Sequence, residues 1–142
     1  MKIFLLMNPP TVTAQERKVT IVRGKPIFFK PANVKNAQAE IVRHLRPFRP
    51  AEPIIGAIEL RVAWLFPKGT KHKAGEWRIT KPDTDNLEKM LKDCMTELRF
   101  WNDDAQVVKE TAEKRWTDEE RSGIAIEIKQ LGKFYEEDEA NG

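Results

Sequence analysis

The sequence predicts a small, single-domain α+β fold with two main helices and a mixed or antiparallel sheet of about four to five strands. The 142 residues fit one hydrophobic core. Two segments carry apolar residues at helical spacing, and others alternate apolar and polar residues, as half-buried strands do. The segments follow in the order strands, helix, strand, helix, two strands, which is typical of an α+β domain.

The N-terminal segments predict strands. Residues 1–7 form a short apolar run that ends before two prolines, and this pattern favours a first strand over a signal peptide. Residues 19–22 and 26–29 are expected to pair as a hairpin around Gly24. The first quarter of the chain therefore supplies one strand and one hairpin.

The next segments predict a helix and then a strand. Asn33 is expected to cap a helix over residues 34–46, which Pro47 ends. The run over residues 54–66 alternates well and predicts a half-buried strand, the clearest in the chain. Its apolar positions are Ile58, Leu60, Val62, Trp64 and Phe66.

The second half of the chain predicts a loop, a helix and two closing strands. The loop covers residues 67–82, and Asp83 opens a helix over 84–98. Strands are expected over about 105–116 and 122–130.

Composition limits the possible functions. The single cysteine, Cys94, excludes an internal disulfide and a multi-cysteine zinc site, and its place on the apolar arc of the second helix indicates a core residue. No apolar stretch is long enough to span a membrane, so we expect a soluble, cytoplasmic protein with no membrane partner. The net charge of +3 is too small to prove nucleic-acid binding by itself.

The second helix carries candidate catalytic residues. Asp83 and Asp85 lie two residues apart across the helix start, and Lys89 follows Asp85 by about one turn. A helical wheel places Asp85 and Lys89 on one face, opposite the apolar arc of Leu87, Met90, Leu91, Cys94 and Leu98. A structural interpretation stays open, in which Asp83 caps the helix and Asp85 pairs with Lys89 on the surface.

A second acidic pair, Asp103 and Asp104, follows the helix. Asn102 and Asp103 are good turn residues, so a structural role is one alternative. Several carboxylates together are also the oxygen ligands that Mg²⁺ binds, commonly with water and a substrate phosphate. The two acidic pairs therefore predict a metal site.

The loop before the second helix concentrates positive charge. A solvated charge run is one reading, but beside a carboxylate group the loop is better explained as a DNA-contacting surface. Trp77 in this loop is expected to anchor it in the core, with stacking on a base as the alternative. The predicted DNA-binding residues are Lys68, Lys71, Lys73, Arg78 and Lys81.

Two motifs together resemble one known family. The sequence D-x-D-N-L-x-K at residues 83–89, followed by FWNDDAQVV at residues 100–108, resembles the RusA-type Holliday junction resolvases. The resemblance implies a homodimeric, Mg²⁺-dependent endodeoxyribonuclease, with Mn²⁺ as a substitute ion, that cuts four-way DNA junctions by paired symmetric nicks in recombination and repair. Such enzymes are often encoded by prophages. Residues 1–132 would then form the nuclease domain, and residues 133–142 a flexible acidic tail.

The resemblance also assigns residue roles. It implies that Asp83, Asp85 and Asp104 bind the metal and are catalytic, and that Lys89 is a catalytic lysine. Supporting positions fall on Asn86 and Asp103. Two other functions stay open, namely a nuclease for other branched DNA and a non-catalytic DNA-binding recombination accessory protein.

Overall fold

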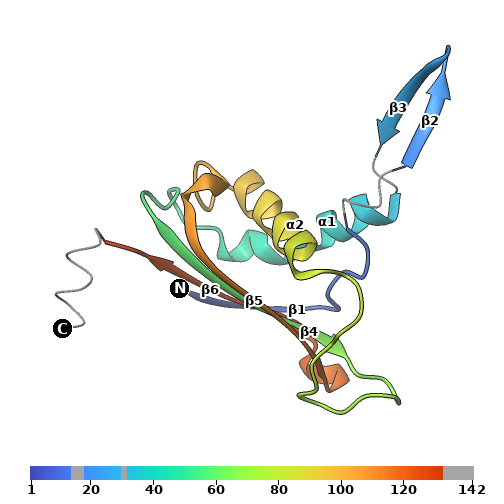
Figure 1. Ribbon diagram of the computed structural model, residues 1–142. Coiled ribbons are helices and arrows are strands. Elements are labelled where there is room, and N and C mark those ends of the chain that lie inside the picture. Colours follow the sequence, from blue (N-terminus) through green and yellow to red (C-terminus); the bar gives the residue numbers. More distant parts are fainter. Residues whose placement is uncertain (14–17, 30–31, 133–142) are drawn as a thin grey trace.

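The computed structural model describes residues 1–13, 18–29 and 32–132, and these residues form an α+β domain. Two helices cover one face of a mixed four-stranded sheet, and a two-stranded hairpin projects from the body (Figure 1). The predicted fold class is confirmed. The expected acidic tail over residues 133–142 lies outside the described residues.

The four-stranded sheet has the order β1-β6-β4-β5. β1 and β4 both pair with β6 in antiparallel orientation, whereas β4 and β5 run parallel. Parallel neighbours need a crossover connection, and helix α2 (Thr84–Glu97) provides it. The strands are β1 Lys2–Leu6, β4 Ile58–Pro67, β5 Val107–Thr117 and β6 Gly123–Gln130.

The core lies between the helices and this sheet. The five alternating apolar residues predicted on β4 are all at most 3% exposed, which confirms their common face. Facing them, the predicted apolar arc of α2 is buried, Cys94 included. Burying one large apolar side chain contributes about 1.5–3 kcal/mol, so this contact fixes α2 firmly on the sheet.

Helix α1 spans Ala32–Leu45 and begins before its predicted start. Asn33 therefore lies inside the first turn, and its predicted role as N-cap is wrong. Alanine is the strongest helix former, so the helix extends back to Ala32. A short 3₁₀ turn, η2 (Arg46–Phe48), follows α1 and contains Pro47, as expected of a helix-ending proline.

Two strand starts differ from prediction. β4 begins at Ile58 rather than at residue 54, because Gly56 with φ 85° interrupts the extended backbone. Ile54 forms only an isolated bridge to Trp101. β5 begins at Val107 rather than at residue 105, because the preceding residues form the 3₁₀ turn η3 (Asp104–Gln106).

The predicted hairpin is confirmed as β2 (Lys18–Val22) and β3 (Lys25–Phe29). The register joins Val22 to Lys25, so the turn consists of two residues, Arg23 and Gly24. Both have positive φ, at 52° and 78°, as in the type I′ turn that matches strand twist. The hairpin forms a sheet of its own and extends past α1 (Figure 1).

The helices of the described residues are short or amphipathic. None of them combines the length and the apolar character that crossing a membrane requires.

Candidate active site

The N-terminal end of α2 presents two exposed carboxylates. Asp83 occupies the N-cap position with extended backbone, and its carbonyl oxygen accepts a hydrogen bond from Leu87 N at 3.1 Å. Its side chain makes no capping hydrogen bond, so the structural interpretation of Asp83 as a side-chain cap is wrong. Asp85 lies in the first helical turn and is also exposed. The positive end of the helix dipole favours negative groups here.

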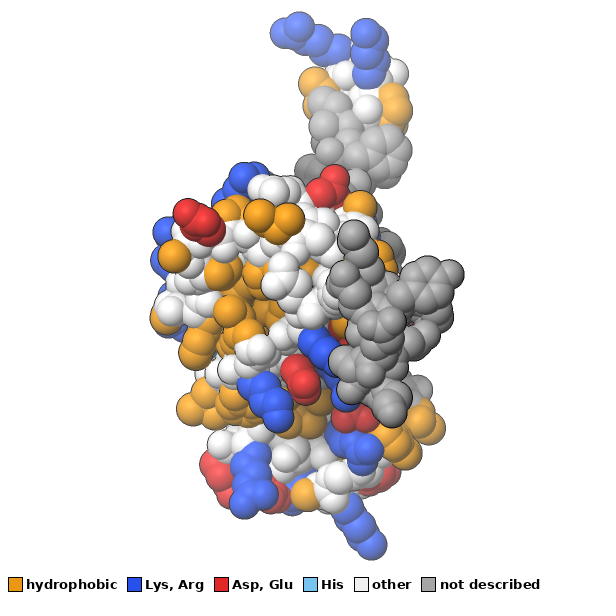
Figure 2. Space-filling view, turned by 90° about the vertical axis from the view of Figure 1, so that its left-hand side faces the viewer, with side chains coloured by type: hydrophobic (Ala, Val, Ile, Leu, Met, Phe, Trp, Pro, Cys, Tyr) orange, Lys and Arg blue, Asp and Glu red, His pale blue; other side chains and the backbone are white. Residues whose placement is uncertain are grey.

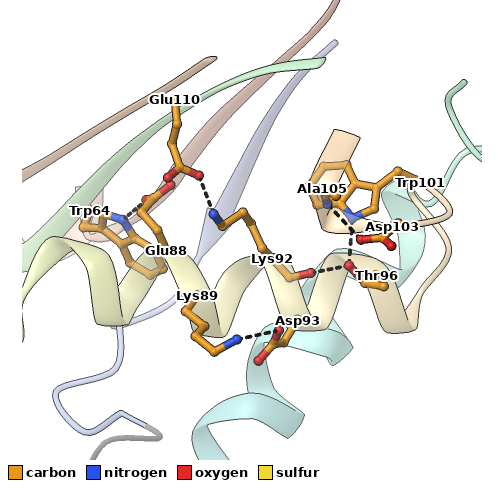
Figure 3. A network of polar contacts seen from close by, with 10 residues as sticks. All are labelled: Trp64, Glu88, Lys89, Lys92, Asp93, Thr96, Trp101, Asp103, Ala105 and Glu110. Carbon is orange, nitrogen blue, oxygen red and sulfur yellow. Dashed lines mark hydrogen bonds and ion pairs between the residues drawn. The ribbon is translucent and has the colours of Figure 1, made fainter. Parts of the chain in front are cut away.

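Lys89 lies one turn further along the same exposed face. Its ammonium group forms an ion pair with Asp93 at 3.7 Å (Figure 3), and among the described residues it forms no ion pair with Asp85. An exposed pair of this kind contributes only about 0.3–0.5 kcal/mol. Lys89 can therefore exchange this partner for a phosphate at little cost. Asn86 is half-buried in the same turn as Asp85.

Lys114 on β5 holds the segment that leads into Asp83. Its Nζ donates hydrogen bonds to the carbonyl oxygens of Thr80 and Pro82, both at 2.7 Å. Partial burial lowers the pKa of Lys114, the nearby Arg78 lowers it further, and Asp83 raises it. Sequence reasoning missed this residue. The sequence offered one indication of its importance: Lys114 lies two residues before Trp116, so the two side chains share one face of the predicted strand.

Arg78, a predicted DNA-binding residue, has structural contacts in the free protein. Its guanidinium donates to the Lys81 carbonyl oxygen from Nη2 at 2.6 Å and from Nε at 3.2 Å. It also lies over the rings of Phe66 and Trp116, at 4.1 and 4.5 Å from the ring centroids. Burial lowers the pKa of Arg78. Arg78 therefore fixes the loop that precedes Asp83.

Trp77 is not anchored in the core, and that prediction is wrong. Its side chain is 54% exposed, and the Arg115 guanidinium lies 3.6 Å from its ring centroid. The reason is that the loop runs beside the end of β5, with hydrogen bonds from Gly75 N to Trp116 O and from Arg78 N to Lys114 O. The side chains of successive residues in this extended segment point in opposite directions. The side chain of Arg78 points inward, so that of Trp77 points outward.

The four lysines predicted to bind DNA are not taken up by ion pairs among the described residues. None of them forms an ion pair within the part of the chain that the structure describes. Lys68 is half-buried, whereas Lys71, Lys73 and Lys81 are exposed. The loop that leads into the N-terminal end of α2 therefore carries ammonium groups without an ion-pair partner among the described residues.

Asp103 has the structural role that the turn chemistry allowed. Its carboxylate accepts a hydrogen bond from Ala105 N at 2.9 Å, and Gln106 Oε1 accepts one from Asp103 N at 3.1 Å. These reciprocal bonds form a capping box at η3. Asp104 is the first residue of η3 and is half-buried.

The two acidic pairs lie at opposite ends of α2. The helix has 14 residues, which at 1.5 Å per residue gives a length of about 21 Å. Asp104 is therefore too distant to share an ion with Asp83 and Asp85 of the same chain. Across the described residues, no three His, Cys, Asp or Glu side chains are grouped closely enough to hold a metal. The two exposed carboxylates at the N-terminal end still fit Mg²⁺ chemically, since this ion often takes one or two carboxylates together with water and phosphate.

A buried carboxyl group lies on the inner side of α2. Glu88 is 3% exposed; its Oε1 accepts a hydrogen bond from Trp64 Nε1 at 2.8 Å, while its Oε2 has no partner among the described residues (Figure 3). Glu110 faces it from β5 and forms an ion pair with Lys92 at 3.0 Å. Sequence reasoning missed Glu88, although its place at the edge of the apolar arc, three residues before Leu91, was a signal.

Burial is the main reason that the pKa of Glu88 rises from its ordinary 4.5 to about 7. The Trp64 hydrogen bond lowers this pKa, the Glu110 charge raises it, and the Lys92 charge lowers it. Glu88 is therefore partly protonated near neutral pH, on the buried side of the helix whose exposed side presents Asp85 and Lys89.

Comparisons with known proteins agree with the two motifs. The family model described as Endodeoxyribonuclease RusA matches residues 8–129. The crossover junction endodeoxyribonuclease RusA of Lactococcus phage r1t is 32% identical over 130 residues, which cover 90% of this chain and 95% of the phage protein. The similarity therefore extends over both acidic pairs, the basic loop and the hairpin.

The raised pKa of Glu88 predicts a fold that loses stability with rising pH. The folded chain holds this proton more tightly than the unfolded chain, so the contribution is complete below about pH 4.5 and is lost as the pH rises through about 7. The shift corresponds to roughly 3 kcal/mol.

Glu88→Gln should therefore flatten the dependence of stability on pH and raise the free energy of unfolding near pH 8. Urea denaturation at about pH 5 and pH 8 measures both effects. The control is Glu97→Gln, an exposed change on the same helix, which should leave the pH dependence of stability unchanged. If Glu88→Gln showed the same pH dependence as the wild type, the prediction would be contradicted.

Proposed function

The chain belongs to the RusA family of endodeoxyribonucleases, and we propose that it resolves Holliday junctions by paired, symmetric, metal-dependent nicks. The observation that carries this proposal is the pair of exposed carboxylates, Asp83 and Asp85, at the N-terminal end of α2. The fold does not use Asp83 as a side-chain cap, and the adjacent loop has free lysines. A scaffold that only bound DNA would have no need of exposed carboxylates beside a basic surface, since they repel phosphate. As part of this proposal the protein acts in the cytoplasm of a bacterial host, where the DNA substrate is found; the relative from a Lactococcus phage supports this.

Asp83, Asp85 and Asp104 would hold Mg²⁺, or Mn²⁺ in its place. When bound, the ion supplies an activated water and polarises the scissile phosphate. Other residues of the chain position these carboxylates. Lys114 holds the backbone before Asp83, and the packing of α2 on the sheet orients Asp85.

Lys89 supplies positive charge for the phosphate group that is cut. It lies on the same face of α2 as Asp85, and its weak pair with Asp93 can be exchanged. Asn86 would support the site by hydrogen bonding. Lys68, Lys71, Lys73 and Lys81 would contact the phosphate backbone, with Arg78 holding their loop in place.

We further propose that two copies form the complete site. A Holliday junction has two-fold symmetry, and a C2 dimer presents two identical sites to it. Within one chain Asp104 lies a helix length from Asp83 and Asp85. In a dimer, Asp104 of the partner subunit can complete the ligand set, and the separation within one chain supports this arrangement.

Asp85→Asn tests the chemistry. The amide keeps the shape of the side chain but loses its charge, so nicking of a four-way junction in Mg²⁺ should fall by roughly a hundredfold or more, while junction binding in EDTA persists. Asp118→Asn, an acid at the start of the 3₁₀ turn η4 (Glu119–Arg121) whose side chain makes no capping bond, is the matched control and should cut normally.

The substrates in this assay should include four-way, three-way, flap and linear DNA. Paired symmetric nicks in the four-way junction support the resolvase. Preferred cutting of flaps would favour the nuclease for other branched DNA. Binding without any Mg²⁺-dependent cutting would favour an accessory protein and refute the proposed enzyme.

Mixing two inactive variants tests the shared site. Asp85→Asn and Asp104→Asn should each abolish cutting alone. In a mixed dimer, sites shared between copies leave one site with both carboxylates intact and the other with neither. Co-expressed variants should therefore recover nicking to roughly a quarter of the wild-type rate, since half the dimers are mixed and each has one working site. If dimers that are shown to be mixed recover no nicking, Asp104 acts in the site of its own chain or outside the site.

Neutralising the loop tests its contact with DNA. Lys71→Gln with Lys73→Gln should weaken junction binding and lower the steepness of its salt dependence by about 1 for each removed charge. Binding is measured by fluorescence anisotropy at several salt concentrations. An unchanged slope would remove these lysines from the contact surface.

A further inference from the structure

The β2–β3 hairpin is a basic arm that the proposed active site does not use. Residues 18–29 contain Lys18, Arg23 and Lys25 and no acidic residue. This segment alone carries a charge of +3, equal to the net charge of the whole chain. Figure 2 shows the arm extending from the body with Lys and Arg side chains at its tip. The arm is thus a strongly positive element set apart from the loop before α2.

The turn of the arm places an arginine where its backbone is disfavoured. Arg23 has φ 52°, a left-handed conformation that asparagine or glycine adopts at lower cost. An Asn-Gly pair would form the same type I′ turn without strain. Strain of this kind is commonly retained where a side chain has a function. The turn therefore keeps a charge at the tip at the expense of local stability.

The arm also leaves apolar side chains in water. Ile21 is 75% exposed and Val22 46% exposed, both directly before the turn. The arm is not part of the four-stranded sheet, and of its residues 21–26, whose side chains the structure describes, none belongs to the hydrophobic core. A two-stranded hairpin alone is at best marginally stable in water, so an external surface would stabilise this one.

We propose that the β2–β3 arm is a second DNA-contacting element, which lies along the backbone of a junction arm and pairs Arg23 and Lys25 with phosphates. The inference rests on the proposed function only in taking DNA as the partner. Charge complementarity favours DNA, since the arm of a second copy, placed against this one, would bring the same positive charges together. The shape agrees as well, because the major groove accommodates a two-stranded ribbon.

The test removes the charges while keeping the turn. Arg23→Asn creates the preferred Asn-Gly pair, so the hairpin is preserved, and Lys25→Gln is added to it. Junction binding in EDTA should weaken roughly tenfold at 0.1 M salt, and the salt slope should become shallower by about 2. Arg23→Lys keeps the charge and should bind like wild type.

The matched control neutralises two arginines at the far end of α1. Arg46→Gln with Arg49→Gln changes the net charge equally, and both residues are exposed. This control should lose much less affinity than the arm variant, and equal losses would overturn the proposal. A changed oligomeric state of the arm variant in sedimentation would also overturn it, in favour of an arm that joins two copies.

The two possible failures are separable. Wild-type protein that binds junctions but does not cut them in Mg²⁺ refutes the proposed enzyme. The arm proposal is then still decided by whether the arm variant binds junctions more weakly than the control variant. Wild-type protein that cuts junctions, together with an arm variant that binds as the control does, refutes only the arm. Wild-type protein that binds no DNA refutes both.

Discussion

The packing of α2 against β4 and β5 determines where almost every candidate site residue lies. Parallel strands require a crossover, and a helix that buries one face over them has to run from the end of the first strand back to the start of the second. The N-terminal end of the helix therefore meets the basic loop, and its other end meets η3. Asp83 and Asp85 are brought to the loop by the same connection that separates them from Asp104. One chain cannot shorten this distance without losing the buried face of α2.

Positive side chains have two distinct tasks around the N-terminal end of α2. Arg78 and Lys114 donate to backbone carbonyls, and Arg115 covers the ring of Trp77, so these three cations organise the protein itself. Lys71 and Lys73 have no such partners among the described residues and remain available to an anion. Organising cations are held in place before DNA arrives, which reduces the entropy cost of ordering the loop on binding. A net charge cannot distinguish the two groups.

Local patterns in the sequence predicted the fold class, both helices, the hairpin and the buried face of β4, because each depends on spacing within one segment. Asn33 and Ile54 show the limit of such patterns, since α1 extends back to Ala32 and a left-handed glycine, Gly56, delays the start of β4. The predictions that were wrong, and the residues that were missed, concern contacts between segments distant in sequence. Trp77 faces outward because the loop follows β5, Glu88 is buried beneath Trp64, and Lys114 reaches back to the turn before Asp83. The motifs located the acids, but only the length and packing of α2 show which of them can meet in one chain.

The position of β6 has a consequence for biosynthesis. β6 is the last strand along the described chain, yet it lies in the interior of the sheet, between β1 near the amino terminus and β4. While the chain is still being translated, β1 has no partner in the sheet and β4 lacks one of its two neighbours. Such pairings between sequence-distant strands are slow to form, so the sheet can close only after β6 has left the ribosome. Closure of this sheet is thus expected to wait until β6 itself has been translated.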